Sequence, residues 1–174
     1  FFVVFPPVSH WVWGWGCVAD LGVIEFAGEL VVHTTDGVSA LVIAILLGNR
    51  NEFANNVKPP HNPALVMVGA CMLWVGWFGF NGGSQLAMAS KTDVDAIANV
   101  FANTHIAAVA GSLAALTFSF FINKEVNLPF LLNGALAGLV AITPCPDYPS
   151  LALAVFIGAF GGLFMFNADR FVEK

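Results

Sequence analysis

Long uncharged runs alternate along this chain with short segments that hold nearly all of its charged residues. Five uncharged runs have about the 20 residues that a helix needs to cross the hydrocarbon core of a bilayer: 1–19, 59–90, 96–123, 126–146 and 148–168. A sixth segment, 24–47, is apolar except for Glu25, Glu29, His33 and Asp36. The pattern predicts an all-α polytopic membrane protein with one truncated and five complete spans.

Composition strengthens this prediction. The chain is 58% hydrophobic and only 10% charged, whereas a soluble domain has roughly a quarter of charged residues. A soluble protein is therefore excluded, and without a basic patch nucleic acid is not expected as a partner. The chain opens on Phe1 inside an apolar run, with no basic segment typical of a signal peptide, so we expect it to be a piece of a longer protein.

The basic residues predict how the spans are oriented. Five of the six fall in loops of one parity, namely Arg50, Lys58, Lys124, Arg170 and Lys174, and only Lys91 falls on the other side. The positive-inside rule makes the first side cytoplasmic. The 24–47 span then begins outside, and His33 lies about 12 Å deeper than Glu25 at 1.5 Å per residue.

The most unusual feature is a histidine at membrane depth with two glutamates before it. Glu25, Glu29 and His33 are spaced i, i+4, i+8 and would share one face of an α-helix. Ionisable residues at this depth usually face a cavity or a partner helix. His33 therefore indicates a pore or proton relay, with a hydrogen bond to a neighbouring helix as the alternative. The glutamates suit either a helix start or a cation-attracting outer mouth.

Other candidate features have ordinary structural explanations beside the functional ones. Trp11, Trp13 and Trp15 fit an interfacial aromatic belt or a surface for a cation. The three cysteines have neither CxxC spacing nor an even count, which favours packed thiols. We predict no metal site, no cofactor and no enzymatic activity, because no complete ligand set, phosphate loop or nucleophile–base pair is present.

Small residues indicate how the helices pack. Gly134 and Gly138 are four apart, as are Gly158 and Gly162, so each pair shares one helix face. In lipid such faces let helices approach closely, because packing drives association there. We expect a compact helical bundle.

Several stretches together make the chain resemble the ammonium transporter family, the Amt/Mep/Rh proteins, and its Amt branch in particular. The matching segments are 9–14 (SHWVWG), 26–33 (FAGELVVH), 60–62 (PHN), 76–84 (GWFGFNGGS), 101–104 (FANT) and 137–144 (AGLVAITP). They occur in family order across nearly the whole chain. The resemblance implies a fold of eleven transmembrane helices per subunit, assembled as a homotrimer, with residues 1–174 as a partial transmembrane domain running from the end of helix four through helix nine.

The resemblance also assigns roles to individual residues. Trp13 and Ser84 look like the outer site for ammonium, supported by Glu25 where the family usually has Asp. Phe80 resembles one of two stacked rings that gate the pore. His33 resembles the first of two pore histidines. Trp77 and Thr143 look like residues that line the pore further down.

The expected activity is conduction of ammonium or ammonia across the plasma or inner membrane. Two departures matter: Glu25 is one methylene longer than Asp, and Glu29 replaces a glycine, adding bulk on the His33 face. They keep open an alternative, an ammonium-sensing membrane module that transports little, and a truncated, non-functional product is a third possibility. The resemblance further implies lipid surroundings and a PII-type regulatory protein as a cytoplasmic partner.

Overall fold

A computed structural model describes residues 2–49 and 61–172, and within these ranges the chain is helical. The elements are α1 (Phe5–Trp13), α2 (Cys17–Asp20), the π-helix η1 (Glu29–Thr34), α3 (Thr35–Leu47), α4 (Pro63–Gly83), α5 (Lys91–Asn123), α6 (Leu128–Ile142) and α7 (Leu151–Val172). Among the described residues, four helical stretches are long and apolar enough to cross a membrane: Glu29–Leu47, Pro63–Gly83, Lys91–Asn123 and Leu151–Val172.

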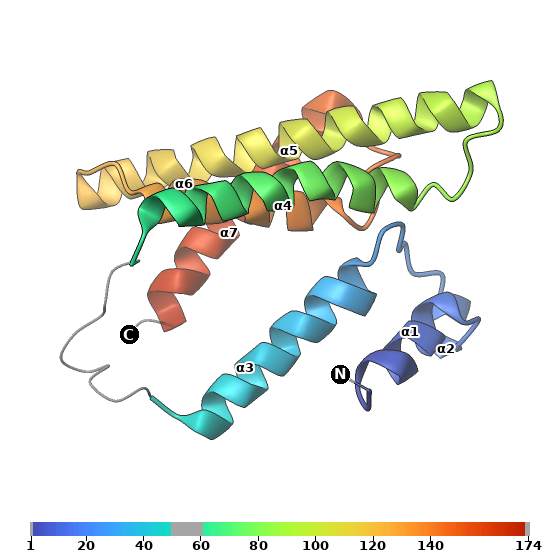
Figure 1. Cartoon of the computed structure of the whole chain (residues 1–174), viewed down its shortest axis with the longest axis horizontal. Coiled ribbons are helices and arrows are strands. Elements are labelled where there is room, and N and C mark those ends of the chain that lie inside the picture. Colours follow the sequence, from blue (N-terminus) through green and yellow to red (C-terminus); the bar gives the residue numbers. More distant parts are fainter. Residues whose placement is uncertain (1, 50–60, 173–174) are drawn as a thin grey trace.

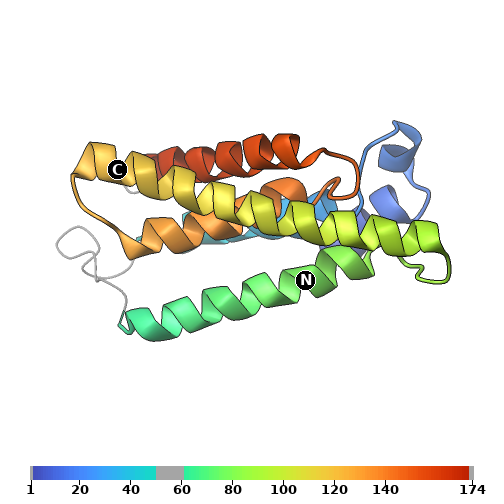
Figure 2. The ribbon, with the colours of Figure 1, turned by 90° about the horizontal axis from the view of Figure 1, so that it is seen from above.

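The core of the fold is the close packing of α5, α6 and α7, which lie side by side in two views (Figures 1 and 2). Glycines make this possible. A Cβ added at Gly138 or Gly158 would come closer than 3.0 Å to backbone atoms of Ala107, and one at Gly162 would do so to Gly111. The predicted role of the paired glycines of α6 and α7 is therefore confirmed, and Gly111 completes the contact from α5.

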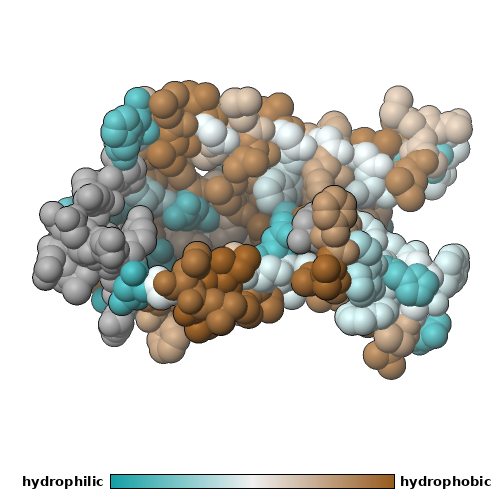
Figure 3. All heavy atoms as spheres, turned by 60° about the horizontal axis from the view of Figure 1, so that its bottom comes forward, coloured by the Kyte–Doolittle hydropathy of each residue, from teal (hydrophilic) through white to brown (hydrophobic). Residues whose placement is uncertain are grey.

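The remaining helices pack less closely. α3 slants away from the α5–α7 bundle, and α4 runs along one side of α5 (Figure 1). Many of their large apolar side chains are exposed on this part of the chain, including Leu46, Leu65 and Met72. Apolar side chains form broad patches on the face drawn in Figure 3. Such surfaces suit lipid or further protein at membrane depth.

Three predicted spans differ from the observed helices. The 1–19 run divides into α1 and α2, with Trp15 between them in the left-handed region at φ 59°. The 24–47 segment becomes helical only at Glu29, so the prediction of a helix through Glu25 is wrong. The 126–146 run yields α6 with only 15 residues, too short for a complete span, because the chain leaves the helix before Pro144.

The non-helical backbone before η1 forms hydrogen bonds with the non-helical backbone at the end of α6. The backbone N–H groups of Phe26 and Ala27 donate to the carbonyl oxygens of Pro144 and Thr143, at 2.8 and 3.3 Å. Backbone outside a helix is tolerated at membrane depth only where its polar groups find such partners. The start of η1 is thereby fixed to the end of α6.

The helix ends agree with the predicted alternation of loops. Lys124 caps α5 and Arg170 lies in the last turn of α7, and both helix ends lie toward the side of the bundle opposite the start of α5 at Lys91 (Figures 1 and 2). Arg50, Lys58 and Lys174 lie outside the described residues. Which end is cytoplasmic stays a prediction.

Candidate functional site

The imidazole of His33 in η1 lies in contact with two aromatic rings of α4, those of Trp77 and Phe80. The imidazole of His33 stacks on the indole of Trp77, with ring centroids 5.0 Å apart and planes inclined by 15°. The ring of Phe80 lies 5.6 Å from His33 and 5.9 Å from Trp77. Trp77 and Phe80 are three residues apart on α4 and so share one face of that helix. Three residues expected along a pore therefore lie in contact with one another.

These rings border a cavity of about 590 Å³ whose lining is almost entirely apolar. Its residues are His33, Gly69, Met72, Leu73, Gly76, Trp77 and Phe80. The Nε2 atom of His33 is buried and has no hydrogen-bond partner among the described residues. A neutral imidazole can donate from one nitrogen and accept at the other, so the ring keeps an unused hydrogen-bonding position at Nε2.

Thr143 accepts a hydrogen bond from the indole of Trp77. The Trp77 Nε1–H donates to Thr143 Oγ1 at 3.0 Å, and the threonine hydroxyl donates in turn to the carbonyl oxygen of Leu139 at 2.7 Å. Thr143 is fully buried. The resemblance assigned Thr143 to the pore lining, but in the described residues its hydroxyl is used between α6 and α4, and it does not border the His33 cavity.

Glu25 lies before the helix and caps its first turn. Its two carboxylate oxygens accept from the N–H of Leu30, each at 3.1 Å, and Oε1 also accepts from the N–H of Val31 at 3.5 Å. Burial raises the pKa of the Glu25 carboxyl, and the two N–H donors oppose that rise. The prediction that Glu25 shares a helix face with Glu29 and His33 is therefore wrong, because the Glu25 side chain caps the helix from outside it.

Trp13 lies at the end of α1, about half exposed, with its indole edge beside Gly28. Gly28 has a φ of 110°, in the left-handed region, and a Cβ there would come within 3.3 Å of the Trp13 ring. Only glycine fits both the backbone conformation and the close approach. Gly28 thus lets the Trp13 indole lie against the start of η1.

Ser84 is the residue that ends α4, one turn beyond Phe80. Its hydroxyl donates to the carbonyl oxygen of Phe80 at 2.8 Å. The hydroxyl oxygen keeps its lone pairs available to a donor such as ammonium. Ser84 is half-buried on this part of the chain.

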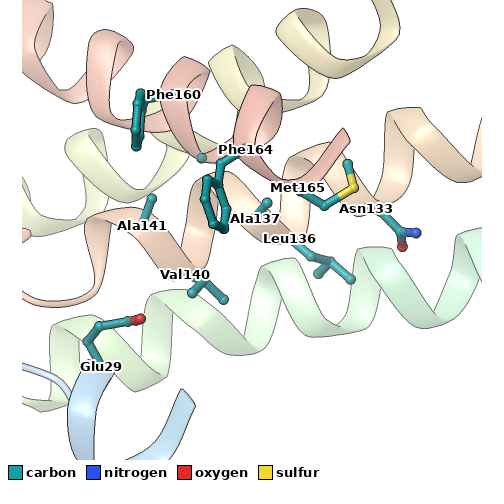
Figure 4. A pocket seen from close by; sticks show the side chains of 10 residues that line it. Glu29, Asn133, Leu136, Ala137, Val140, Ala141, Phe160, Phe164 and Met165 are labelled. Carbon is teal, nitrogen blue, oxygen red and sulfur yellow. The ribbon is translucent and has the colours of Figure 1, made fainter. Parts of the chain in front are cut away.

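Glu29 faces a different space from His33. Its side chain points into a groove of about 500 Å³ beside α6 and α7, lined otherwise by Asn133 and by apolar residues that include Val140 and Phe164 (Figure 4). Glu29 Oε2 is buried without a hydrogen-bond partner among the described residues. The expectation that Glu29 adds bulk on the His33 face is not met, because the two residues border different cavities.

A buried polar network between α4, α5 and the loop after α6 was not predicted. Asn81 Nδ2 donates to Thr104 Oγ1 at 3.0 Å, and both residues are fully buried. Asn103 Nδ2 donates to the carbonyl oxygens of Pro146 and Pro149. Asparagine inside an uncharged run was the available signal, since a buried amide needs partners.

No cluster of three or more histidine, cysteine or acidic residues lies together in residues 2–49 and 61–172. The cysteines are free thiols, and Cys17 and Cys71 are exposed on this part of the chain, contrary to the expectation of packed thiols; Cys145 is half-buried.

Comparison with known proteins gives consistent results. The model of the Ammonium Transporter Family matches residues 1–174. The ammonium transporter of Bacillus subtilis is 41% identical over 165 residues, which cover 94% of this chain and 39% of that protein. The chain therefore spans about two fifths of the length of this curated relative.

Solved structures share the fold of this chain. The structure titled Sensor Amt Protein superposes with a TM-score of 0.90 at 35% identity, covering 99% of this chain and 44% of that one. Mep2 of Candida albicans gives a TM-score of 0.86 at 31% identity, covering 97% and 38%.

Proposed function

Because this chain belongs to the ammonium transporter family, we propose that the protein conducts ammonium, as ammonia and a proton, across a membrane along a path that His33 borders. Membership makes the chain part of a multi-pass membrane protein that is a transporter and not an enzyme. Residues 1–174 then form part of one transmembrane domain in the plasma or inner membrane.

The observation that carries the proposal is the imidazole of His33, which borders an otherwise apolar cavity and whose buried Nε2 has no hydrogen-bond partner among the described residues. A bare ammonium ion is strongly disfavoured in an apolar lumen, whereas neutral ammonia is not. Ammonium therefore loses a proton on entry, ammonia crosses, and the imidazole passes the proton by donating from one nitrogen while accepting at the other. Potassium has no proton to lose, so it is rejected by chemistry and not by size.

Recruitment at the outer end needs groups that replace the hydration shell of the cation. In this proposal the indole of Trp13 supplies a cation–π contact and the hydroxyl of Ser84 accepts a hydrogen bond from ammonium. Glu25 acts from behind by holding the N–H groups that start η1. In this proposal Phe80, whose ring lies beside His33 and Trp77 and one turn before Ser84 on α4, acts as the gate.

Replacing His33 tests the proposal. In the full-length protein, His33→Ala should reduce ammonium-evoked current or lower the selectivity for ammonium over potassium. The matched control is His105→Ala on α5, a histidine that packs against Trp74 and Phe78 away from the cavity and should behave as wild type. Wild-type current and selectivity in His33→Ala would refute the assigned role.

A second candidate function is ammonium sensing with little transport. It is favoured by the likeness to the Sensor Amt Protein, which superposes with a TM-score of 0.90. Uptake of labelled methylammonium separates the two functions, since robust uptake contradicts a pure sensor. Assembly as a homotrimer in the lipid bilayer, and contact with a PII-type protein on the cytoplasmic side, are further parts of the proposal.

A further inference from the structure

His33 lies in a π-helical turn, a conformation that needs a local cause. The carbonyl oxygen of Gly28 accepts from the N–H of Val32, four residues on, at 2.9 Å and from the N–H of His33, five residues on, at 3.3 Å. The widened turn runs from Glu29 to Thr34, after which α3 is a regular α-helix. Such turns are rare and are frequently found at functional sites.

The side chain of Thr35 bonds to the carbonyl that belongs to the widened turn. Its Oγ1 hydroxyl donates to the carbonyl oxygen of Leu30, five residues back, at 2.9 Å, and its backbone N–H is shared between the carbonyl oxygens of Leu30 and Val32. In a regular α-helix the N–H of Thr35 would bond to Val31, and a threonine hydroxyl would reach three or four residues back. The hydroxyl therefore adds a bond that exists only in the π register.

The other end of the turn is also held. Glu25 accepts from the N–H of Leu30 and Val31, and the chain just before η1 is bonded to the end of α6. Conversion to an α register would turn the chain before η1 by about 100° relative to α3, and His33 would take a share of that rotation. The stack of His33 on Trp77, with planes inclined by only 15°, would then be lost.

We propose that Thr35 is a positioning residue whose hydroxyl holds the π register and thereby keeps the imidazole of His33 stacked on Trp77 beside Phe80. The importance of that position for conduction rests on the function proposed above, whereas the structural link between Thr35 and His33 does not.

The test compares four variants of the full-length protein in lipid. Thr35→Val removes the hydroxyl at nearly constant shape, and Thr35→Ala removes it without adding a methyl group should the valine variant fail to insert. Thr35→Ser keeps the hydroxyl. Thr34→Val is the matched control, since Thr34 is the exposed neighbouring threonine.

The first readout is the NMR shift of the His33 ring protons, assigned by comparison with His33→Ala. An indole stacked on the imidazole shields these protons. Thr35→Val and Thr35→Ala should move the signals downfield, while Thr35→Ser and Thr34→Val should leave them in place. Unchanged signals in the variants without the hydroxyl would overturn the proposal.

The second readout is selectivity for ammonium over potassium, expected to fall by about tenfold or more in Thr35→Val and to recover in Thr35→Ser, because small misplacements of a functional group are costly. The two proposals fail separately. If the ring signals move in Thr35→Val but His33→Ala conducts normally, the positioning role stands and the proposed function falls.

Discussion

The close contact of α5 and α7 gives the most quantitative prediction. At Gly158 an added Cβ would come closer than 3.0 Å to three backbone atoms of Ala107, its oxygen, Cα and carbonyl carbon. Backbone in the middle of a helix cannot rotate away as a side chain can, so Gly158→Ala must push the two helices apart. Overpacking of this kind costs about 1–3 kcal/mol and occasionally more.

Helix propensity works in the opposite direction. Alanine is favoured over glycine inside a helix by about 1 kcal/mol. Because three backbone atoms lie this close at Gly158, we place its overpacking cost in the upper part of that range, at about 2–3 kcal/mol. After subtraction of the gain in helix propensity, we expect Gly158→Ala to lower the free energy of unfolding by about 1–2 kcal/mol. Gly37 in α3 is the matched control, because a Cβ there meets no heavy atom within 4 Å. Gly37→Ala should raise stability by about 0.5–1 kcal/mol.

The assay is the unfolding midpoint of the full-length protein in detergent, followed by circular dichroism for both variants. A double variant, Gly158→Ala with Ala107→Gly, makes the test sharper. Because the contacted atoms belong to the backbone, removing the methyl group of Ala107 should not restore stability. Rescue by Ala107→Gly, or wild-type stability of Gly158→Ala alone, would refute a backbone contact at this position.

Two further predictions concern the polar contacts of the site. Thr143→Val leaves the Trp77 indole N–H without an acceptor and should lower the free energy of unfolding by about 1–3 kcal/mol. Thr143→Ser keeps the hydroxyl and should retain most of the wild-type stability. Equal unfolding midpoints for the two variants would contradict a stabilising role of this hydrogen bond. Burial raises the pKa of Glu25 above its ordinary 4.5, so the folded state binds this proton more tightly and the carboxyl contributes less stability as pH rises through that pKa. Glu25→Gln should lack this decrease, which unfolding of both proteins across pH would measure; a wild-type advantage that grows with pH would contradict it.

The sequence predicted features that depend on composition and on helical spacing. Uncharged runs located α4, α5 and α7 because only apolar helices of that length suit a bilayer. Glycines four residues apart predicted the close helix faces of α6 and α7, and the same spacing of Ala107 and Gly111 in α5 was a signal left unused.

Features that depend on contacts distant in sequence were not predictable. Spacing alone placed Glu25 on a helix face, since nothing local reveals that Thr143 and Pro144 bind the backbone of Phe26 and Ala27 and delay the helix start. The glycine at position 28 was the local sign that the helix does not run through this segment, because glycine readily adopts the left-handed conformation seen there. Residue roles came from resemblance, but the stack of His33 on Trp77, and the use of Thr143 behind it, required the assembled helices.

Packing and polar bonding divide the molecule into two parts with different tasks. The α5–α7 bundle is held by backbone contacts that allow no side chain at the glycines, so it can move little. The site lies on η1 and α4, which are joined to the bundle by directional bonds such as those of Trp77 with Thr143 and of Asn81 with Thr104. In lipid, apolar surface gives no net driving force to place such helices, so these few bonds set their register. The glycines therefore set the packing of the bundle, and these polar bonds set the geometry of the site.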